Sequence, residues 1–219
     1  MADAALILAV GDLPSLVALG AALSQLRPAQ VRLLHLKDTR VNARSRRRTA
    51  LEQAKHYDVR PPIELQMPAL GSSAQAEHRG VPPEQAHAAL LDAQILLVGL
   101  AQAIELRVSQ LIWPVQVDAD FDRCAAVTEQ VQLVDELAQL DHDQVPQIET
   151  PLVELDDQQV VELGAHLDVP WRLAWTCLLH GETPCRVCPA CRQRHAAFDA
   201  AGIVDPVDEP VGVGTRDER

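Results

Sequence analysis

Hydrophobic residues follow two patterns along this chain: short continuous apolar runs, and longer stretches in which apolar positions recur with helical spacing. The short runs predict buried strands, because a strand that is covered on both faces is apolar at every position. We expect strands at residues 4–10, 31–36, 63–67 and 108–115. The longer stretches predict helices at residues 16–26, 44–57, 84–107 and 125–140. A proline-, glycine- and serine-rich stretch at residues 68–83 predicts a loop.

Strands that alternate with helices predict an α/β fold with a doubly wound, mostly parallel sheet and helices on both faces. We expect this α/β domain at residues 1–147, a helical C-terminal segment at 148–206 and a disordered tail at 207–219. In the second segment, Asp156 and the glutamine three positions later have the spacing of a capping box and predict a helix at residues 157–166.

Ligands of open parallel sheets usually bind beyond the carboxyl ends of the strands. The first strand ends at the turn Gly11–Ser15, so this turn is the place where a nucleotide-like ligand would be expected. Four basic side chains of the second helix and one just before it lie on the same side of the sheet: Arg40, Arg44, Arg46, Arg47 and Arg48. They are either a solvated helix start, ion-pair partners of an acidic region, or a contact for an anion or nucleic acid.

Charge is unevenly distributed along the 219 residues, whose formal net charge is −12. Residues 118–168 contain 14 acidic residues and one basic residue, Arg123, whereas residues 27–60 contain 10 basic and 3 acidic residues. The overall sign argues against nucleic acid as a general partner. No stretch reaches the roughly 18 apolar residues of a membrane helix, and no basic region precedes the first apolar run. We therefore expect a cytoplasmic globular protein.

Four of the five cysteines fall within 15 residues: Cys177, Cys185, Cys188 and Cys191. Closely spaced thiolates are the preferred ligands of tetrahedral zinc, and four of them leave no open coordination position, so a structural Zn²⁺ is expected. An iron–sulfur cluster also takes four thiolates, and disulfides are the third alternative, although a cytoplasmic chain seldom forms them. We expect His180 and His195 to lie outside the metal's ligand set. Cys124 is expected to be a buried apolar side chain.

The cysteines lie within a longer signature that includes Trp175-Thr176-Cys177, residues 184–194 and residues 201–206. This signature resembles the C-terminal region of the 7-cyano-7-deazaguanine synthase family, and the resemblance is strong over residues 148–206 and weaker over residues 4–147. It implies a PP-loop (HUP-like) fold and zinc on the four cysteines. It also implies ATP-dependent activation of the carboxylate of 7-carboxy-7-deazaguanine, followed by conversion with ammonia to the nitrile, in queuosine and related pathways.

The nucleotide loop departs from that family. The family loop reads Ser-Gly-Gly-x-Asp-Ser, whereas this chain has Val10-Gly11-Asp12-Leu13-Pro14-Ser15, in which only Gly11 and Ser15 match. Asp12 places a carboxylate where a phosphate would bind, and Pro14 removes a backbone donor. The family's lysine in the next segment aligns with Asp157, its Pro-x-Arg-Asn arginine has no counterpart in residues 81–92, and its glycine after the fourth strand aligns near Pro114.

These features predict a divergent family member that has lost ATP chemistry and acts in binding or scaffolding. Its partner would be a deazaguanine, a nucleotide-like molecule, an active paralogue or a second copy of the chain. The alternative is a working ligase with a rebuilt loop, in which Arg40, Arg44 or Arg46 supplies the missing charge. A third possibility is an interaction module whose acidic region 118–168 binds a basic partner.

Overall fold

The structure, a computed structural model, describes residues 2–38, 40–66 and 91–207. Its centre is a sheet of five strands: β1 (Ala2–Leu8), β2 (Val31–Lys37), β3 (Ile63–Gln66), β4 (Val108–Ile112) and β5 (Gln147–Glu149). The order is β3-β2-β1-β4-β5, and every neighbouring pair is parallel. This confirms the predicted doubly wound α/β fold.

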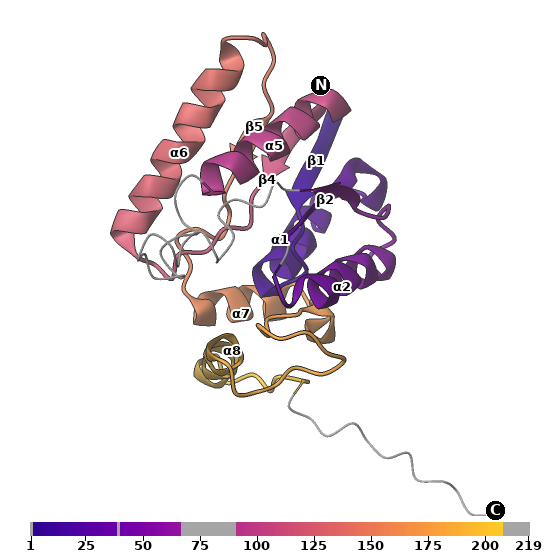
Figure 1. The fold of residues 1–219 in the computed structure, drawn as a ribbon, viewed down its shortest axis with the longest axis vertical. Coiled ribbons are helices and arrows are strands. Elements are labelled where there is room, and N and C mark those ends of the chain that lie inside the picture. The colour runs from indigo at the N-terminus through magenta and orange to yellow at the C-terminus, as the bar shows by residue number, and fades with distance from the viewer. Residues whose placement is uncertain (1, 39, 67–90, 208–219) are drawn as a thin grey trace, which may run out of the picture.

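Helices cover both faces of the sheet (Figure 1). They are α1 (Leu13–Leu23), α2 (Ala43–His56), α5 (Leu91–Leu106), α6 (Phe121–Gln139), α7 (Asp157–His166) and α8 (Pro189–Ala200), with short 3-10 turns at Pro28–Gln30 and Trp171–Leu173. Within these described residues, no helix is both long enough and apolar enough to cross a membrane.

Alternating side chains of β1 divide the core into two layers. Ala5 and Ile7 pack with α1 and α7, whereas Leu6 and Leu8 pack with α5 and α6. All four side chains are almost fully buried, which explains why the strand reads as a continuous apolar run rather than as an alternating one.

The predicted strands and helices are confirmed, with shifted boundaries. The first helix begins at Leu13, and α6 begins at Phe121, because Asp12 and Asp120 cap their first turns. The capping box of Asp156 and Gln159 is present at the start of α7. The predicted loop 68–83, the first part of the predicted helix 84–107 and residues 208–219 of the predicted tail lie outside the described residues.

The sequence pattern did not predict β5. Its three residues, Gln147–Glu149, are too few and too polar to form an apolar run, and their strand conformation depends on pairing with β4. The strand extends the sheet at residues 147–149, where we had expected the C-terminal segment to start. From β5 the chain continues directly into α7 and the cysteine-containing region.

The strand order places a crevice at the carboxyl ends of the sheet. From β1 the chain proceeds outward to β2 and β3, and it then returns to the other side of β1 to form β4 and β5. Connections therefore leave β1 and β4 in opposite directions. In open α/β sheets, a ligand site usually lies in the crevice between two such strands. The C-terminal segment with α7 and α8 lies at one end of the molecule (Figure 1).

Candidate functional site

The four predicted cysteines converge in the C-terminal segment. Their sulfur atoms all lie within 4.8 Å of one another, and Cys177 and Cys191 are buried. Cys188 is the N-cap of α8 and Cys191 lies in its first turn, so one helix start presents two of the sulfurs. A tetrahedral zinc with Zn–S bonds of about 2.3 Å spaces its sulfurs by roughly 3.8 Å. The Sγ atoms of Cys185 and Cys191 are 4.0 Å apart, so the cluster can hold one metal ion.

Backbone N–H groups surround these sulfurs. Leu179 and Cys185 both donate to Sγ of Cys177 at 3.4 Å, and Cys188 donates to Sγ of Cys185 at 3.4 Å. Such donors stabilise the thiolate, which is the form that binds metals. All five cysteines are free thiols in the structure, so the disulfide alternative receives no support.

The pKa values of the four thiols are spread by their surroundings. Desolvation opposes ionisation of Cys188, but N–H groups of Leu178 and Cys191 donate to its sulfur and lower its pKa to about 6. Its position at the N-terminus of α8 acts in the same direction. Burial raises the pKa of Cys177 and of Cys191. Backbone N–H groups of Val187 and Cys188 also lower the pKa of Cys185, so Cys185 and Cys188 ionise more readily than the two buried thiols.

The remaining candidate ligands lie outside the cluster, as predicted. Nδ1 of His180 is 2.8 Å from the hydroxyl of Ser45, and His195 faces Asp199 at 3.7 Å. Cys124 is half-buried on α6, where its thiol donates to the carbonyl of Val153 at 3.3 Å. In the chain as described, the four cysteines are the only group of three or more side chains placed to share a metal.

The N-terminal half of α2 holds the cysteine segment against the sheet. Asn42 donates to the carbonyl of Cys177 at 2.9 Å, and Arg48 donates to the carbonyl of Gly181 at 3.2 Å. The guanidinium of Arg48 also lies 5.5 Å from the ring centre of Trp175, a cation–π contact. The N–H of Trp175 in turn donates to the carbonyl of Gly11 at 2.8 Å. The chain just before the cysteines is therefore hydrogen-bonded directly to the turn Gly11–Ser15.

A buried arginine anchors α8, a role that the sequence pattern did not predict. Nε of Arg194 lies 2.5 Å from Asp205, and its other nitrogens donate to the carbonyls of Ala174 at 2.8 Å and Trp171 at 3.1 Å. Both charged side chains are almost completely buried. The ion pair thus joins α8, the chain before Cys177 and the end of the described C-terminus.

A cleft of about 270 Å³ opens at the carboxyl ends of the strands, where the sequence predicted the ligand side. Its polar and charged lining comes from the turn after β1, from α2 and the residues before it, from the chain after β4, from the residue before Cys177, and from α7 and α8. These residues are Asp12, Arg40, Asn42, Arg46, Gln116, Asp157, Thr176, Gln193 and Arg194. This volume is just below the range of about 300–1,000 Å³ that is usual for ligand pockets.

In the turn Gly11–Ser15, side chains of the turn accept hydrogen bonds from backbone N–H groups of the same turn. The N–H groups of Gly11 and Asp12 both donate to the Ser15 hydroxyl at 3.1 Å, and the N–H of Ser15 donates to the Asp12 carboxylate at 3.0 Å. Pro14 has no N–H. Within these five described residues, only Leu13 keeps an N–H without a hydrogen bond. The turn is closed as a helix cap, whereas a phosphate loop keeps its N–H groups open to a ligand.

Gly11 has a structural requirement of its own. Its φ is +80°, and a Cβ at this position would collide with the carbonyl oxygen of Arg46. The match of Gly11 to the family loop is therefore explained by the close approach of α2, without reference to a phosphate.

The arginines of the predicted cluster are mostly engaged in structural contacts. Arg46 donates to the carbonyl of Val10 at 3.2 Å, and both Arg40 and Arg46 pair with Asp38. Partial burial opposes ionisation of Asp38, but the adjacent Arg40 and Arg46 hold its pKa below the ordinary value. Burial, together with the charge of Arg40, lowers the pKa of Arg46. Arg44 is exposed.

The remaining members of this cluster have acidic partners nearby. Arg47 pairs with Glu64 at 2.6 Å, and Arg48 lies 4.0 Å from Glu52. In the described parts of the chain, no ion pair joins the cluster to residues 118–168, so the alternative in which the acidic region is its ion-pair partner receives no support. The two regions are held on different elements of the fold.

Asp157 joins three parts of the cleft. Its carboxylate accepts hydrogen bonds from the amides of Gln116 at 2.8 Å and Gln193 at 2.6 Å. These side chains come from the chain after β4 and from α8, so Asp157 at the start of α7 links the sheet edge to the cysteine segment. In the sequence, Asp157 is notable only because it stands where the family has a lysine. Its two hydrogen-bond partners could not be predicted, because they are distant in the chain.

Comparison with known proteins identifies the family. A model of the family described as Queuosine biosynthesis protein QueC matches residues 4–202. The 7-cyano-7-deazaguanine synthase of Trichodesmium erythraeum (strain IMS101) is 40% identical over 60 residues, which are 27% of each chain. The enzyme of the same name from Methanothrix thermoacetophila is 40% identical over 63 residues, which are 29% of this chain and 28% of the relative. The aligned part thus spans under a third of these relatives.

Two solved structures are similar at low identity. The U34-tRNA thiolase NcsA from Methanococcus maripaludis, solved with its [4Fe-4S] cluster, has a TM-score of 0.47 and 17% identity, and the match covers 90% of this chain and 64% of that one. The NMN synthetase from Francisella tularensis has a TM-score of 0.46 and 16% identity, with coverage of 92% and 84%. The family model, by contrast, spans most of the sequence, and the chain belongs to the QueC family of queuosine biosynthesis proteins.

Proposed function

We propose that this chain is a zinc-bound QueC-family protein that does not use ATP and acts by binding a ligand or a partner at the end of its sheet. One observation carries the proposal: the N–H groups of Gly11, Asp12 and Ser15 are already bonded within the turn. An ATP phosphate would have to displace the Ser15 hydroxyl and the Asp12 carboxylate before those donors could reach it.

The charge around the cleft supports the same conclusion. Three lining arginines, Arg40, Arg46 and Arg194, face four carboxylates, namely those of Asp12 and Asp157 in the lining and of the paired Asp38 and Asp205. Two like charges about 4 Å apart repel by about 1 kcal/mol in water and by about 4 kcal/mol near a protein surface. A triphosphate would add negative charge to a site without spare positive charge.

The uncharged part of the cleft is suited to a heterocycle. Trp175 and Asn42 belong to the lining, and the hydroxyl of Thr176 is buried without a hydrogen-bond partner. An aromatic wall with a few polar groups is the usual composition of a small-molecule site. A deazaguanine or a nucleotide-like molecule without a triphosphate is therefore the ligand class that we assign to the cleft.

The cysteine geometry supports zinc as the metal. A single ion brings four sulfurs close together, whereas a cubane iron–sulfur cluster places four irons between its thiolates and spreads them further apart. Sulfurs within 4.8 Å of one another suit the single ion. Four thiolates close its coordination shell, so Cys177, Cys185, Cys188 and Cys191 would hold a structural zinc that contributes to folding of the C-terminal segment.

Metal analysis of freshly purified chain tests the zinc assignment. We expect close to one zinc per chain and loss of the ordered C-terminal segment on chelation. A zinc content below half an equivalent, or iron with sulfide in its place, would overturn the assignment.

Turnover tests the loss of ATP chemistry. The chain is incubated with ATP, ammonia and 7-carboxy-7-deazaguanine, with a 7-cyano-7-deazaguanine synthase from the curated relatives as positive control. We expect no nitrile above the enzyme-free blank. Turnover would establish the working ligase instead. Arg44 is then the first residue to replace, because it is exposed and, among the described contacts, has no acidic partner, unlike Arg40 and Arg46.

A further inference from the structure

Helix α6 carries two apolar faces, and only one of them is packed. Val127 and Val134 are buried against α5 and the sheet. On another side, Leu133 and Leu137 of the helix and Leu140, its C-cap, are 59%, 51% and 80% exposed. Their spacing of four and three residues aligns them in one stripe, which extends over roughly 10 Å of helix. We call these three residues the leucine stripe.

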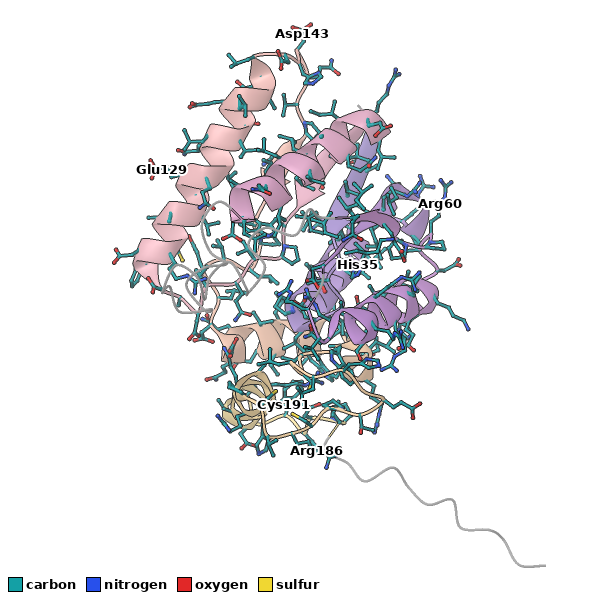
Figure 2. The ribbon with its side chains drawn as sticks, in the orientation of Figure 1. His35, Arg60, Glu129, Asp143, Arg186 and Cys191 are labelled. Atoms are coloured by element: carbon teal, nitrogen blue, oxygen red, sulfur yellow. The ribbon has the colours of Figure 1, made fainter. Side chains whose placement is uncertain are left out.

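Acidic side chains border the leucine stripe. Glu129 lies one helical turn before Leu133, and Glu136 lies one turn before Leu140, so both are surface neighbours of the stripe. Glu129 projects away from the body of the molecule, and Asp143 lies beyond the end of α6 (Figure 2). Residues 118–168 contain 14 acidic residues and a single basic one, Arg123, so the region around this face is strongly acidic.

We propose that the leucine stripe and its acidic border form a docking surface for a basic amphipathic helix of another protein. The leucines would receive the apolar side of that helix, and Glu129 and Glu136 would pair with its lysines or arginines. An amphipathic helix in an apolar groove is a common recognition mode, and complementary charge fixes its orientation and raises its association rate. This inference is independent of the ligand proposed for the cleft.

Charge excludes the other occupants of this face. Residues 67–90 contain two glutamates and one arginine, and residues 208–219 contain four acidic residues and two arginines, so neither segment has the basic character required. A second copy that met the first through the same face would place Glu129 and Glu136 against their own equivalents, which is unfavourable. A partner with basic side chains is the occupant whose charge is complementary to the acidic border of the leucine stripe.

Binding of a designed peptide tests the surface with the full chain. The probe is a fluorescent helical peptide of leucine and lysine with one apolar face, followed by anisotropy at low salt. The L133S/L137S variant is expected to bind about tenfold more weakly than the parent chain. The matched control is V41S/V204S, which replaces two exposed valines elsewhere and is expected to change affinity less than twofold.

Three further arms complete the test. E129K/E136K is expected to weaken binding and to reduce its salt dependence, because fewer charge pairs remain to be screened. A peptide of the same composition without an apolar face is expected to bind at least tenfold more weakly. Equal affinities for L133S/L137S and V41S/V204S would overturn the proposal. A chain dimer in sedimentation that disappears in L133S/L137S would also overturn it, and would assign the stripe to a second copy.

Discussion

The turn at Gly11–Ser15 and the cysteine segment use the same structural element in opposite ways. Each places backbone N–H groups at the start of a helix, α1 in one case and α8 in the other. In α1 the side chains of Asp12 and Ser15 form a complete capping box. In α8 the N-cap is Cys188, and its sulfur belongs to the cysteine cluster. The cap position of α1 is thus occupied by side chains that bond only within the turn, whereas the cap position of α8 carries a sulfur that can also bind a metal ion.

Removing a cysteine of the cluster should have the largest effect. C191S deletes a buried thiol of the proposed metal site, so we expect loss of bound metal and destabilisation of the C-terminal segment by several kcal/mol, because metal binding and folding are coupled. Metal analysis and thermal unfolding measure the two effects. C124S is the control, since Cys124 lies on α6 outside the cluster. If C191S retained full metal content, the cluster would not be a metal site.

Breaking the buried ion pair of the same segment should rank next. D205N leaves the guanidinium of Arg194 buried without its carboxylate, and removal of one partner of such a pair costs about 3–5 kcal/mol. Urea unfolding gives the difference, with D199N as control because Asp199 is largely exposed. Equal stability of D205N and D199N would show that the segment is held mainly by its metal.

Opening the α1 cap should have a smaller effect and should still not produce an ATP site. S15A removes the acceptor shared by the N–H groups of Gly11 and Asp12, and loss of a capping residue costs about 0.5–2 kcal/mol. Asp12 remains, so we expect no binding of Mg-ATP. S24A, which removes an exposed hydroxyl at the other end of α1, is the control. Recovery of ATP binding in S15A would mean that the hydroxyl alone blocks the turn.

The smallest effect on stability is expected from His35, whose ring contacts the backbone just after β1. Its Nδ1 is 2.8 Å from the carbonyl of Ala9, and burial lowers its pKa below the ordinary 6.5. The folded state therefore takes up this proton less readily than the unfolded state. The stabilisation is complete above pH 6.5 and is lost as pH falls through the lowered pKa, by at most about 1.4 kcal/mol per pH unit.

Unfolding free energies between pH 7 and 5 test this contribution. We expect H35N to show a shallower loss of stability than the parent chain, and H142N, at an exposed position, to match the parent. A parent-like slope in H35N would assign the acid sensitivity to other groups.

Some features of the molecule followed from the sequence because they depend on neighbouring residues. The apolar runs of the first four strands, the capping box of Asp156 and the spacing of the cysteines are local patterns. The pairing of β5 with β4, the bonds of Asp157 to Gln116 and Gln193, and the ion pair of Arg194 with Asp205 join positions brought together only by the fold. The arginine cluster shows the same limit, because its contacts to Asp38, Glu64 and Gly181 cannot be inferred from a run of charges.

Calorimetry with Mg-ATP tests the central claim most directly, namely that this family member keeps its cysteine site and has lost its nucleotide site. The zinc-loaded chain is titrated in parallel with a 7-cyano-7-deazaguanine synthase as a positive control. We predict one zinc per chain and no saturable heat from Mg-ATP, because the donors of Gly11, Asp12 and Ser15 are bonded within the turn. Saturable binding with a micromolar Kd would contradict the account.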